Sequence, residues 1–136
     1  MDDLFLIGRI IFGGFFLYNG ANHLLSTATM TPYVASKGVP MPEAAIVLTG
    51  LLLLVGGLSI LLGLWPHVGA LCIVVFLVGV TPVMHNFWAD TDPTARMGNL
   101  ANFTKNVALL GGALMTLAIP RPWPYSVERR RTTVRA

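Results

Sequence analysis

Charged residues are scarce in this chain of 136 residues, at 11% of the total, whereas hydrophobic residues make up 54%. A soluble domain of this size could not bury so much apolar surface, so the composition excludes a soluble fold and predicts a membrane protein. Cysteine is nearly absent too, because the chain has only Cys72, in an apolar run. That excludes an intramolecular disulfide and a dithiol redox pair built by this chain alone.

Basic residues are also few outside the C-terminus. The formal net charge is +3, and four arginines crowd the end of the chain, at Arg129, Arg130, Arg131 and Arg135. The body has no basic face, which argues against a nucleic-acid partner. The arginines instead indicate that the C-terminus contacts anionic lipid headgroups or fixes the orientation of the protein in the membrane. Because residues 121–136 show no periodicity, we expect them to form a mobile, cytoplasmic tail.

Apolar stretches dominate the rest of the chain. Candidate membrane spans, each near the roughly 20 residues that a crossing helix needs, cover residues 4–25, 44–64, 68–84 and 100–119. Between the first two, Met30, Tyr33 and Val34 are spaced for a short amphipathic turn at the membrane interface. The expected fold class is all-α, an integral membrane four-helix bundle that forms one domain over residues 1–120.

The arginine-rich end should stay in the cytoplasm under the positive-inside rule. An even number of spans then places the N-terminus there as well, and Arg9 agrees with that orientation. In this arrangement the strongly polar residues near the membrane all fall in its outer half. The inner half contains mainly glycine and aliphatic residues, which allow close helix packing.

The polar residues of the outer half form the candidate site. Asn19 and His23 are four residues apart and share a helix face. Lys105 lies in the first turns of the last span, where a lysine would cost up to about 3 kcal/mol at the centre of the bilayer. We predict a ligand-binding polar pocket formed by Asn19, Asn22, His23, His85, Asn86, Asn102, Lys105 and Asn106. The alternative is that these side chains only cap or bridge helices and that Lys105 reaches the headgroups.

Several segments, in this order, resemble the DoxX-like family of small bacterial four-helix membrane proteins. They are GRIIFGGFFLYNGANHL, KGVPMPEA, LLLLVGGLSILLGLW, HNFW and NFTKNVALLGG, and the resemblance covers about residues 5–118. It implies a multi-pass protein of the bacterial plasma membrane. It also implies a link to redox chemistry and oxidative stress, because relatives include the membrane subunit of a thiosulfate:quinone oxidoreductase and partners of complexes that handle thiol and oxidative stress.

Two functions compete on this basis. The first is an accessory or scaffold subunit of a membrane-bound redox or cell-envelope complex. Relatives often have a carboxylate in the second helix shortly before a glycine pair, and the corresponding stretch here, residues 51–55, is wholly apolar. That difference lowers the expectation of an enzyme, and no catalytic residue is assigned.

The second function is a quinone-binding subunit of a thiol or thiosulfate oxidoreductase. His23, His85 and Lys105 could then hydrogen-bond the quinone carbonyls and move protons, with Tyr18 and Trp88 flanking the ring. In this hypothesis the protein contacts the lipid bilayer, a quinone and other membrane protein subunits. Formation of a homo-oligomer is a further alternative.

Other cofactors have weaker support. The hypothesis of a haem bound between His23 and His85 is supported by these two histidines alone. A zinc site lacks a four-ligand set, because His67 falls on the opposite side of the membrane and Cys72 lies inside a helix. Transport of a small solute or a lipid would need an oligomer, because one four-helix chain leaves little room for a pathway.

Overall fold

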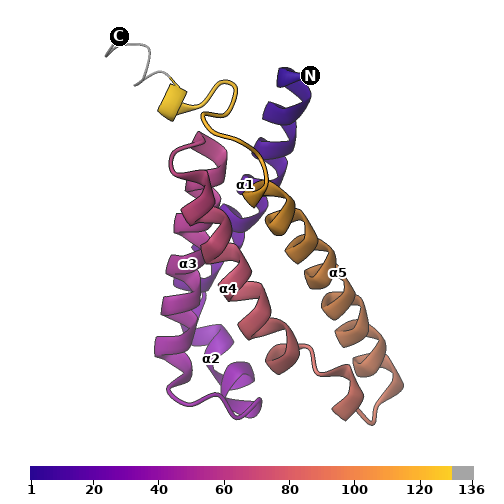
Figure 1. The fold of residues 1–136 in the computed structure, drawn as a ribbon. Helices are drawn as coiled ribbons and strands as arrows, with labels where there is room; N and C mark the ends of the chain where they lie inside the picture. Colours follow the sequence, from indigo (N-terminus) through magenta and orange to yellow (C-terminus); the bar gives the residue numbers. More distant parts are fainter. Residues whose placement is uncertain (130–136) are drawn as a thin grey trace.

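The structure, a computed structural model, describes residues 1–129. Its regular secondary structure in these residues consists of helices alone, and Figure 1 shows them in chain order. The elements are α1 (Asp2–Leu25), α2 (Thr27–Ser36), α3 (Pro42–Leu62), α4 (Pro66–Met84), the short 3-10 helix η1 (Phe87–Ala89) and α5 (Pro93–Leu117). The short helix α2 occupies the segment in which the sequence predicted an amphipathic turn.

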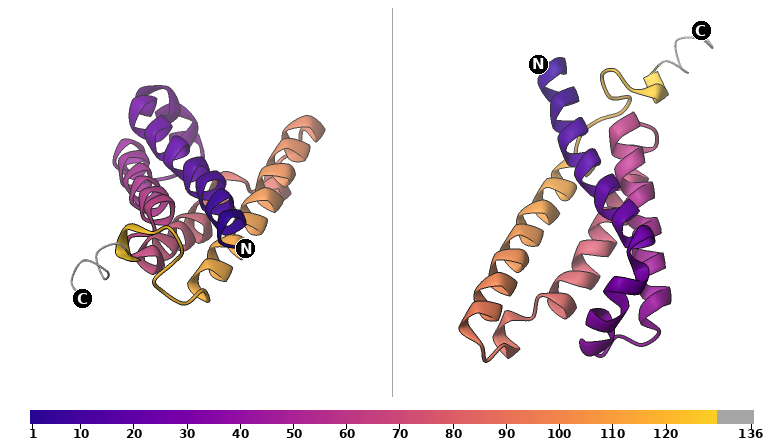
Figure 2. Two further views of the ribbon diagram at one scale, coloured as in Figure 1. Left: turned by 90° about the horizontal axis from the view of Figure 1, so that it is seen from above. Right: turned by 180° about the vertical axis from the view of Figure 1, so that it is seen from behind.

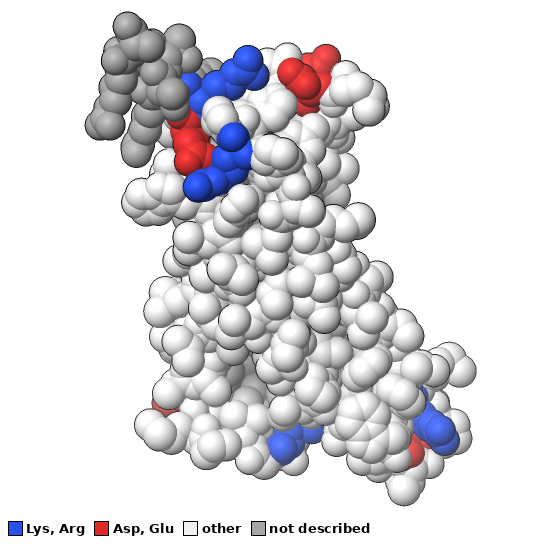
Figure 3. Space-filling model, in the orientation of Figure 1, with Lys and Arg blue, Asp and Glu red and all other residues white. Residues whose placement is uncertain are grey.

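Three helical segments of the described chain are long and apolar enough to cross a membrane, namely α1, α3 and residues 66–89. The helix α5 is 25 residues long, but its first turns are too polar for it to join this group. The expected fourth span and the cytoplasmic placement of the termini therefore stay predictions. Figure 3 shows an uncharged middle of the molecule, with charged side chains gathered at its two ends.

Glycines bring α1 and α3 into close contact. A Cβ atom added at Gly57 would lie 2.6 Å from the backbone nitrogen of Leu17, and one at Gly13 would lie 2.9 Å from the carbonyl oxygen of Gly57. Small residues allow this approach between membrane helices, where packing replaces the hydrophobic effect as the driving force. The glycine-mediated packing expected from the sequence is present in this helix pair.

The core lies where α1, α3, α4 and α5 meet. Phe16, Leu53, Ile73 and Leu77 are almost completely buried and form its centre. The helix α5 approaches α1 near Gly112, where an added Cβ atom would lie 3.0 Å from the ring of Phe12. Both side views show α5 diverging from α1 toward its own N-terminal end, far from the chain termini (Figures 1 and 2).

Arg9 joins three segments at the end of the molecule that carries the termini. Its side chain is only 3% exposed, and its guanidinium donates to the carbonyl oxygens of Ile60 at 3.1 Å, Leu61 at 2.8 Å and Pro124 at 2.6 Å. The last carbonyls of a helix have no partner within the helix, so Arg9 satisfies the C-terminal end of α3. It also holds the segment after α5 against that end.

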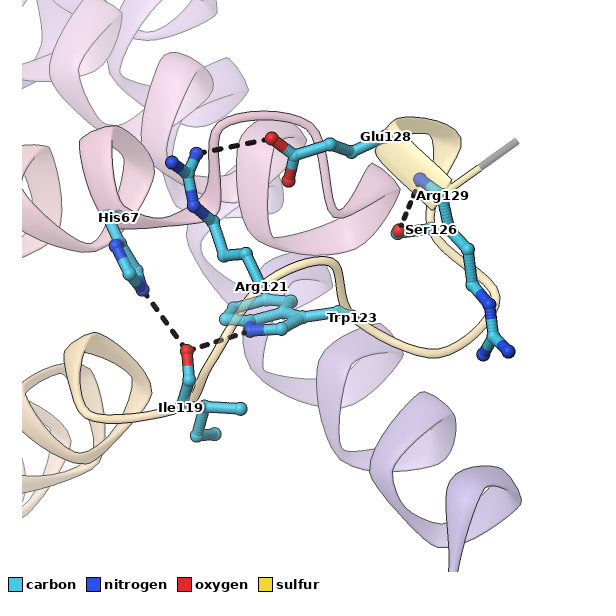
Figure 4. A network of polar contacts seen from close by, with 7 residues as sticks. All are labelled: His67, Ile119, Arg121, Trp123, Ser126, Glu128 and Arg129. Atoms are coloured by element: carbon cyan, nitrogen blue, oxygen red, sulfur yellow. Dashed lines mark hydrogen bonds and ion pairs between the residues drawn. The ribbon is translucent and has the colours of Figure 1, made fainter. Parts of the chain in front are cut away.

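The segment that follows α5 differs from the expected mobile tail. Trp123 and Ser126 are fully buried, and the Trp123 ring packs edge-on against Phe5 with ring centroids 5.1 Å apart. Figure 4 shows the Trp123 indole and the His67 ring donating to the same carbonyl oxygen, that of Ile119, at 3.4 and 3.2 Å. A buried aromatic anchor thus overrides the lack of periodicity. The remaining arginines, Arg130, Arg131 and Arg135, lie outside the described residues.

Candidate ligand-binding cavity

A cavity of about 640 Å³ opens between the helices at the end that carries α2. All five α-helices contribute to its wall, including Phe16 of α1, Val34 of α2, Ile46 of α3, Phe76 of α4 and Leu109 of α5. The wall is mainly aliphatic and aromatic. A volume of this size falls within the range of roughly 300–1,000 Å³ typical of small-molecule sites.

The structure brings part of the predicted polar set to this one cavity. The residues on its wall are Asn19, His23, His85, Lys105 and Asn106. They come from α1, from the end of α4 and from α5, so three separate segments place polar groups around one space. Such polar residues at membrane depth are candidates for a functional site.

The other predicted residues are not on the wall, and each accepts a hydrogen bond from a neighbour. Asn22 accepts from the hydroxyl of Ser26 at 3.1 Å, on the exposed side of α1. Asn86 and Asn102 accept from the ammonium groups of Lys37 and Lys105, at 2.8 and 3.0 Å. Asn86 and Asn102 therefore hold lysines near the cavity instead of facing a ligand.

His23 is held in one orientation by its own helix. Its Nδ1 lies 2.8 Å from the carbonyl oxygen of Asn19, which can only accept a hydrogen bond, so Nδ1 is the donor. The ring stands edge-on to Phe76 with centroids 6.0 Å apart. In this tautomer a neutral His23 has its lone pair on Nε2.

His85 is oriented by a chain of hydrogen bonds that includes two residues outside the predicted set. The amide nitrogen of Asn99 donates to the Asp90 carboxylate at 2.8 Å, and this bond fixes which end of the amide is oxygen. That oxygen lies 3.3 Å from Nδ1 of His85. Nδ1 is again the donor, and a neutral His85 has its lone pair on Nε2.

Asn106 and Lys105 behave differently although they are adjacent in the chain. Asn106 is buried, and its amide nitrogen donates to the hydroxyl of Thr81 at 3.1 Å, which joins α5 to α4. Lys105 is exposed, and its ammonium group reaches along its own helix to Asn102. Lys105 therefore stands at the rim of the cavity, where part of its surface remains accessible.

Sequence reasoning missed several residues around the cavity. Tyr33 lies on the wall and donates to the carbonyl oxygen of Met84 at 3.3 Å, and Lys37 lies above the Tyr33 ring with its Nζ atom 5.6 Å from the centroid. Both belong to a segment rich in proline and glycine that carried no span pattern. Asn99 was visible as part of the polar face of α5, but only the fold shows that it contacts His85.

The aromatic residues expected beside the ligand are elsewhere. Tyr18 is 72% exposed and Trp88 is 58% exposed, and neither lines the cavity. Trp88 packs against Phe103 with ring centroids 5.9 Å apart. The placement of these two rings was therefore wrong. Helical spacing alone did not say which face of α1 turns inward at Tyr18, and Trp88 lies in η1, where it packs against α5. Phe15, Phe16 and Phe76 line the cavity instead.

Metal ligands do not gather anywhere in residues 1–129, where no group of three or more His, Cys, Asp or Glu side chains is placed to hold an ion. His67 lies at the opposite end of the molecule from the cavity, beside Ile119. His23 and His85 share the cavity wall.

These observations define a class of protein, a helical membrane protein with a ligand-sized cavity between its helices. A family model described as DoxX matches residues 4–86, which is more than half of the chain, and the chain therefore belongs to the DoxX family. The resemblance noted from the sequence motifs is confirmed.

A curated relative gives the location. The chain is 31% identical to the inner membrane protein YphA of Escherichia coli strain K12 over 127 residues, which cover 93% of this chain and 89% of that relative. Together with the apolar helices, this similarity confirms a multi-pass protein of the bacterial inner membrane. No solved structure is significantly similar to the chain.

Proposed function

We propose that this DoxX-family protein binds an amphipathic molecule of the membrane, of the quinone type, in the cavity between its helices. The observation that carries the proposal is the cavity itself, about 640 Å³ in volume, with polar side chains on a mainly apolar wall. An amphipathic ligand fits such a site because its apolar part contacts the wall and its polar headgroup meets the few hydrogen-bonding groups.

The position of the polar groups supports a quinone-type headgroup. Such a headgroup is a flat ring with two oxygen substituents, and it needs aromatic or aliphatic surfaces on its faces and polar partners at its edges. Phe15, Phe16 and Phe76 supply surfaces, while His23 and His85 supply polar edges. An imidazole can donate a hydrogen bond through one ring nitrogen and accept one through the other, as a ring that gains and loses protons requires.

An accessory role in a redox or envelope complex is compatible with this binding function. The stretch of α3 from residue 51 to residue 55 has no carboxylate that could carry protons, and in this proposal a partner subunit supplies the redox chemistry. Purification in mild detergent, followed by identification of the proteins that travel with the chain, tests this role. A redox enzyme among them supports it, and a chain that purifies alone at full binding capacity argues against it.

Blocking the cavity tests the binding function. Gly79 lies on the cavity wall, and a Cβ atom added there meets nothing within 4 Å. Gly79→Phe should therefore place a ring inside the cavity without displacing the backbone. Gly111→Phe is the matched control, because Gly111 also has open space around it but does not line the cavity.

The measurement is the affinity for a short-chain ubiquinone in nanodiscs. We expect Gly79→Phe to weaken binding at least about tenfold, which corresponds to about 1.4 kcal/mol, while Gly111→Phe binds like the unmodified protein. Equal affinities for the two variants would show that the ligand does not occupy the cavity. Absence of binding by the unmodified protein, for the oxidised and the reduced form alike, would overturn the proposed function.

A further inference from the structure

We infer that the cavity prefers the reduced, hydroxyl-bearing form of a quinone-type ligand, because its wall presents hydrogen-bond acceptors. This inference rests on the proposed function and adds which chemical form of the ligand the site recognises. A hydroquinone ring donates two hydrogen bonds through its hydroxyl groups, whereas the oxidised quinone can only accept them.

The two histidines supply the acceptors. In both rings Nδ1 donates to a protein oxygen, the Asn19 carbonyl at 2.8 Å for His23 and the Asn99 amide oxygen at 3.3 Å for His85. A neutral imidazole that donates through one nitrogen accepts through the other. Both side chains line the cavity, so each can offer the lone pair of Nε2 to a ligand hydroxyl.

Several donors on the cavity wall are already engaged within the protein. The hydroxyls of Tyr33 and Thr49 donate to the carbonyl oxygens of Met84 and Ala45, at 3.3 and 2.8 Å. The amide nitrogens of Asn19 and Asn106 donate to the Phe15 carbonyl and the Thr81 hydroxyl, at 2.7 and 3.1 Å. These bonds direct the two hydroxyl hydrogens and one hydrogen of each amide away from a ligand, and each amide keeps a second hydrogen.

Two further polar groups of the wall can still form hydrogen bonds with a ligand. Thr29 has a hydroxyl that can donate or accept, and Lys105 has an ammonium group of which one hydrogen is directed to Asn102. Lys105 stands at the exposed rim, so a quinone carbonyl could reach it there. The two half-buried imidazoles of the wall offer acceptors as well, and a ligand with only acceptors would leave their Nε2 lone pairs unpaired, which costs free energy.

Asp90 and Asn99 act as positioning residues in this arrangement. Asp90 accepts from the Asn99 amide nitrogen at 2.8 Å and so turns the amide oxygen toward His85. Without that oxygen, Nδ1 of His85 has no acceptor, and the proton can move to Nε2. The ring would then donate toward the ligand instead of accepting from it.

The first measurement compares the two forms of one ligand under anaerobic conditions. Ubiquinol-1 and ubiquinone-1 are titrated into the full-length protein in nanodiscs. We expect ubiquinol-1 to bind at least about tenfold more tightly, because a site built to pair with a hydroxyl discriminates strongly against an analogue that lacks it. Equal affinity, or tighter binding of ubiquinone-1, overturns the inference and leaves the proposed function standing. Absence of binding by both forms overturns the proposed function and the inference with it.

The second measurement reads the tautomers directly. Nitrogen-15 NMR of histidine-labelled protein, with the signals assigned by His23→Phe and His85→Phe, should show the proton on Nδ1 in both neutral rings. Asn99→Leu should move the His85 proton to Nε2 and reduce the preference for ubiquinol-1 at least about threefold, while Thr104→Leu, on the same helix but off the cavity wall, should change neither. A neutral His85 with its proton on Nε2 in the unmodified protein overturns the inference.

Discussion

Arg9 shows how a charged residue can be accommodated in a mainly apolar helix. Its guanidinium carries donors in a fixed planar arrangement, and three of them meet carbonyl oxygens from α3 and from the segment after α5. The Trp123 ring lies 5.6 Å from the guanidinium carbon, which adds a cation–π contact. The sequence marked Arg9 only as a sign of topology, because its partners are distant in the chain.

Replacing Arg9 should destabilise the fold measurably. We expect Arg9→Leu to lower the free energy of unfolding by about 2–4 kcal/mol, because it removes the donor of the partly buried carbonyl oxygens of Leu61 and Pro124. Arg9→Lys should have an intermediate effect, since an ammonium group cannot reproduce the planar arrangement. Thermal unfolding in detergent measures both variants. Arg96→Leu is the control, because Arg96 is exposed, and an equal loss in the control would remove the special role of Arg9.

Among the elements, the pair α1 and α3 depends on the absence of side chains where the two backbones meet. Gly13 and Gly20 of α1 face Gly57 and Gly50 of α3, and an added Cβ atom at any of them would come within 3.0 Å of the neighbouring helix. Small residues in the sequence predicted close packing. They did not say which glycines meet, since Gly8 and Gly14 have open space around them.

A methyl group at the contact should separate these helices. We expect Gly57→Ala to lower the free energy of unfolding by about 1–3 kcal/mol, because the added atom meets the backbone of α1 and neither helix can yield easily. Gly111→Ala, which has nothing within 4 Å of the new atom, should be neutral or slightly stabilising through helix propensity. Steric trapping or thermal unfolding in detergent can compare the two, and the contact is unimportant if both variants behave alike.

The first turns of α5 cannot be found by searching the sequence for apolar stretches alone. The expected span began at residue 100, but the helix begins at Pro93, after Asp92, whose carboxylate accepts from the backbone nitrogen of Ala95 at 2.8 Å. Aspartate at the N-cap followed by proline is a helix-start signal that does not depend on hydrophobicity. The extra turns carry Asn99 to the contact with His85.

For the whole molecule, composition alone indicated a helical membrane protein, and the family and location agree with it. Parts of the candidate site were also visible, because Asn19, His23 and Lys105 interrupt apolar runs. The cavity and the hydrogen bonds from Asp90 through Asn99 to His85 were not predictable, since they depend on how far α5 diverges from the other helices. Nor did local patterning reveal that Trp123 packs against α1, because a contact between the two ends of a chain leaves no periodic signal.

The sidedness of the molecule remains a prediction that labelling can test. We expect the end with α2 and η1 to face away from the cytoplasm, and the end with Trp123 to face the cytoplasm, as the arginine-rich terminus indicates. In a Cys72→Ser background, Ser36→Cys should react with an impermeant maleimide on intact spheroplasts, and Arg121→Cys only after permeabilisation. Both parent residues are exposed, so access is not the limiting factor, and the reverse pattern would invert the predicted orientation.

The hydrogen bond between Arg9 and Pro124 joins residues that are 115 positions apart. During synthesis the arginine enters the translocation machinery long before its last acceptor has been made, and until then the carbonyl groups of α3 alone must satisfy it. The packing of Arg9 against the segment after α5 is therefore a late step of biogenesis. A chain interrupted before Trp123 would lack both the Pro124 carbonyl and the Trp123 ring that contact Arg9.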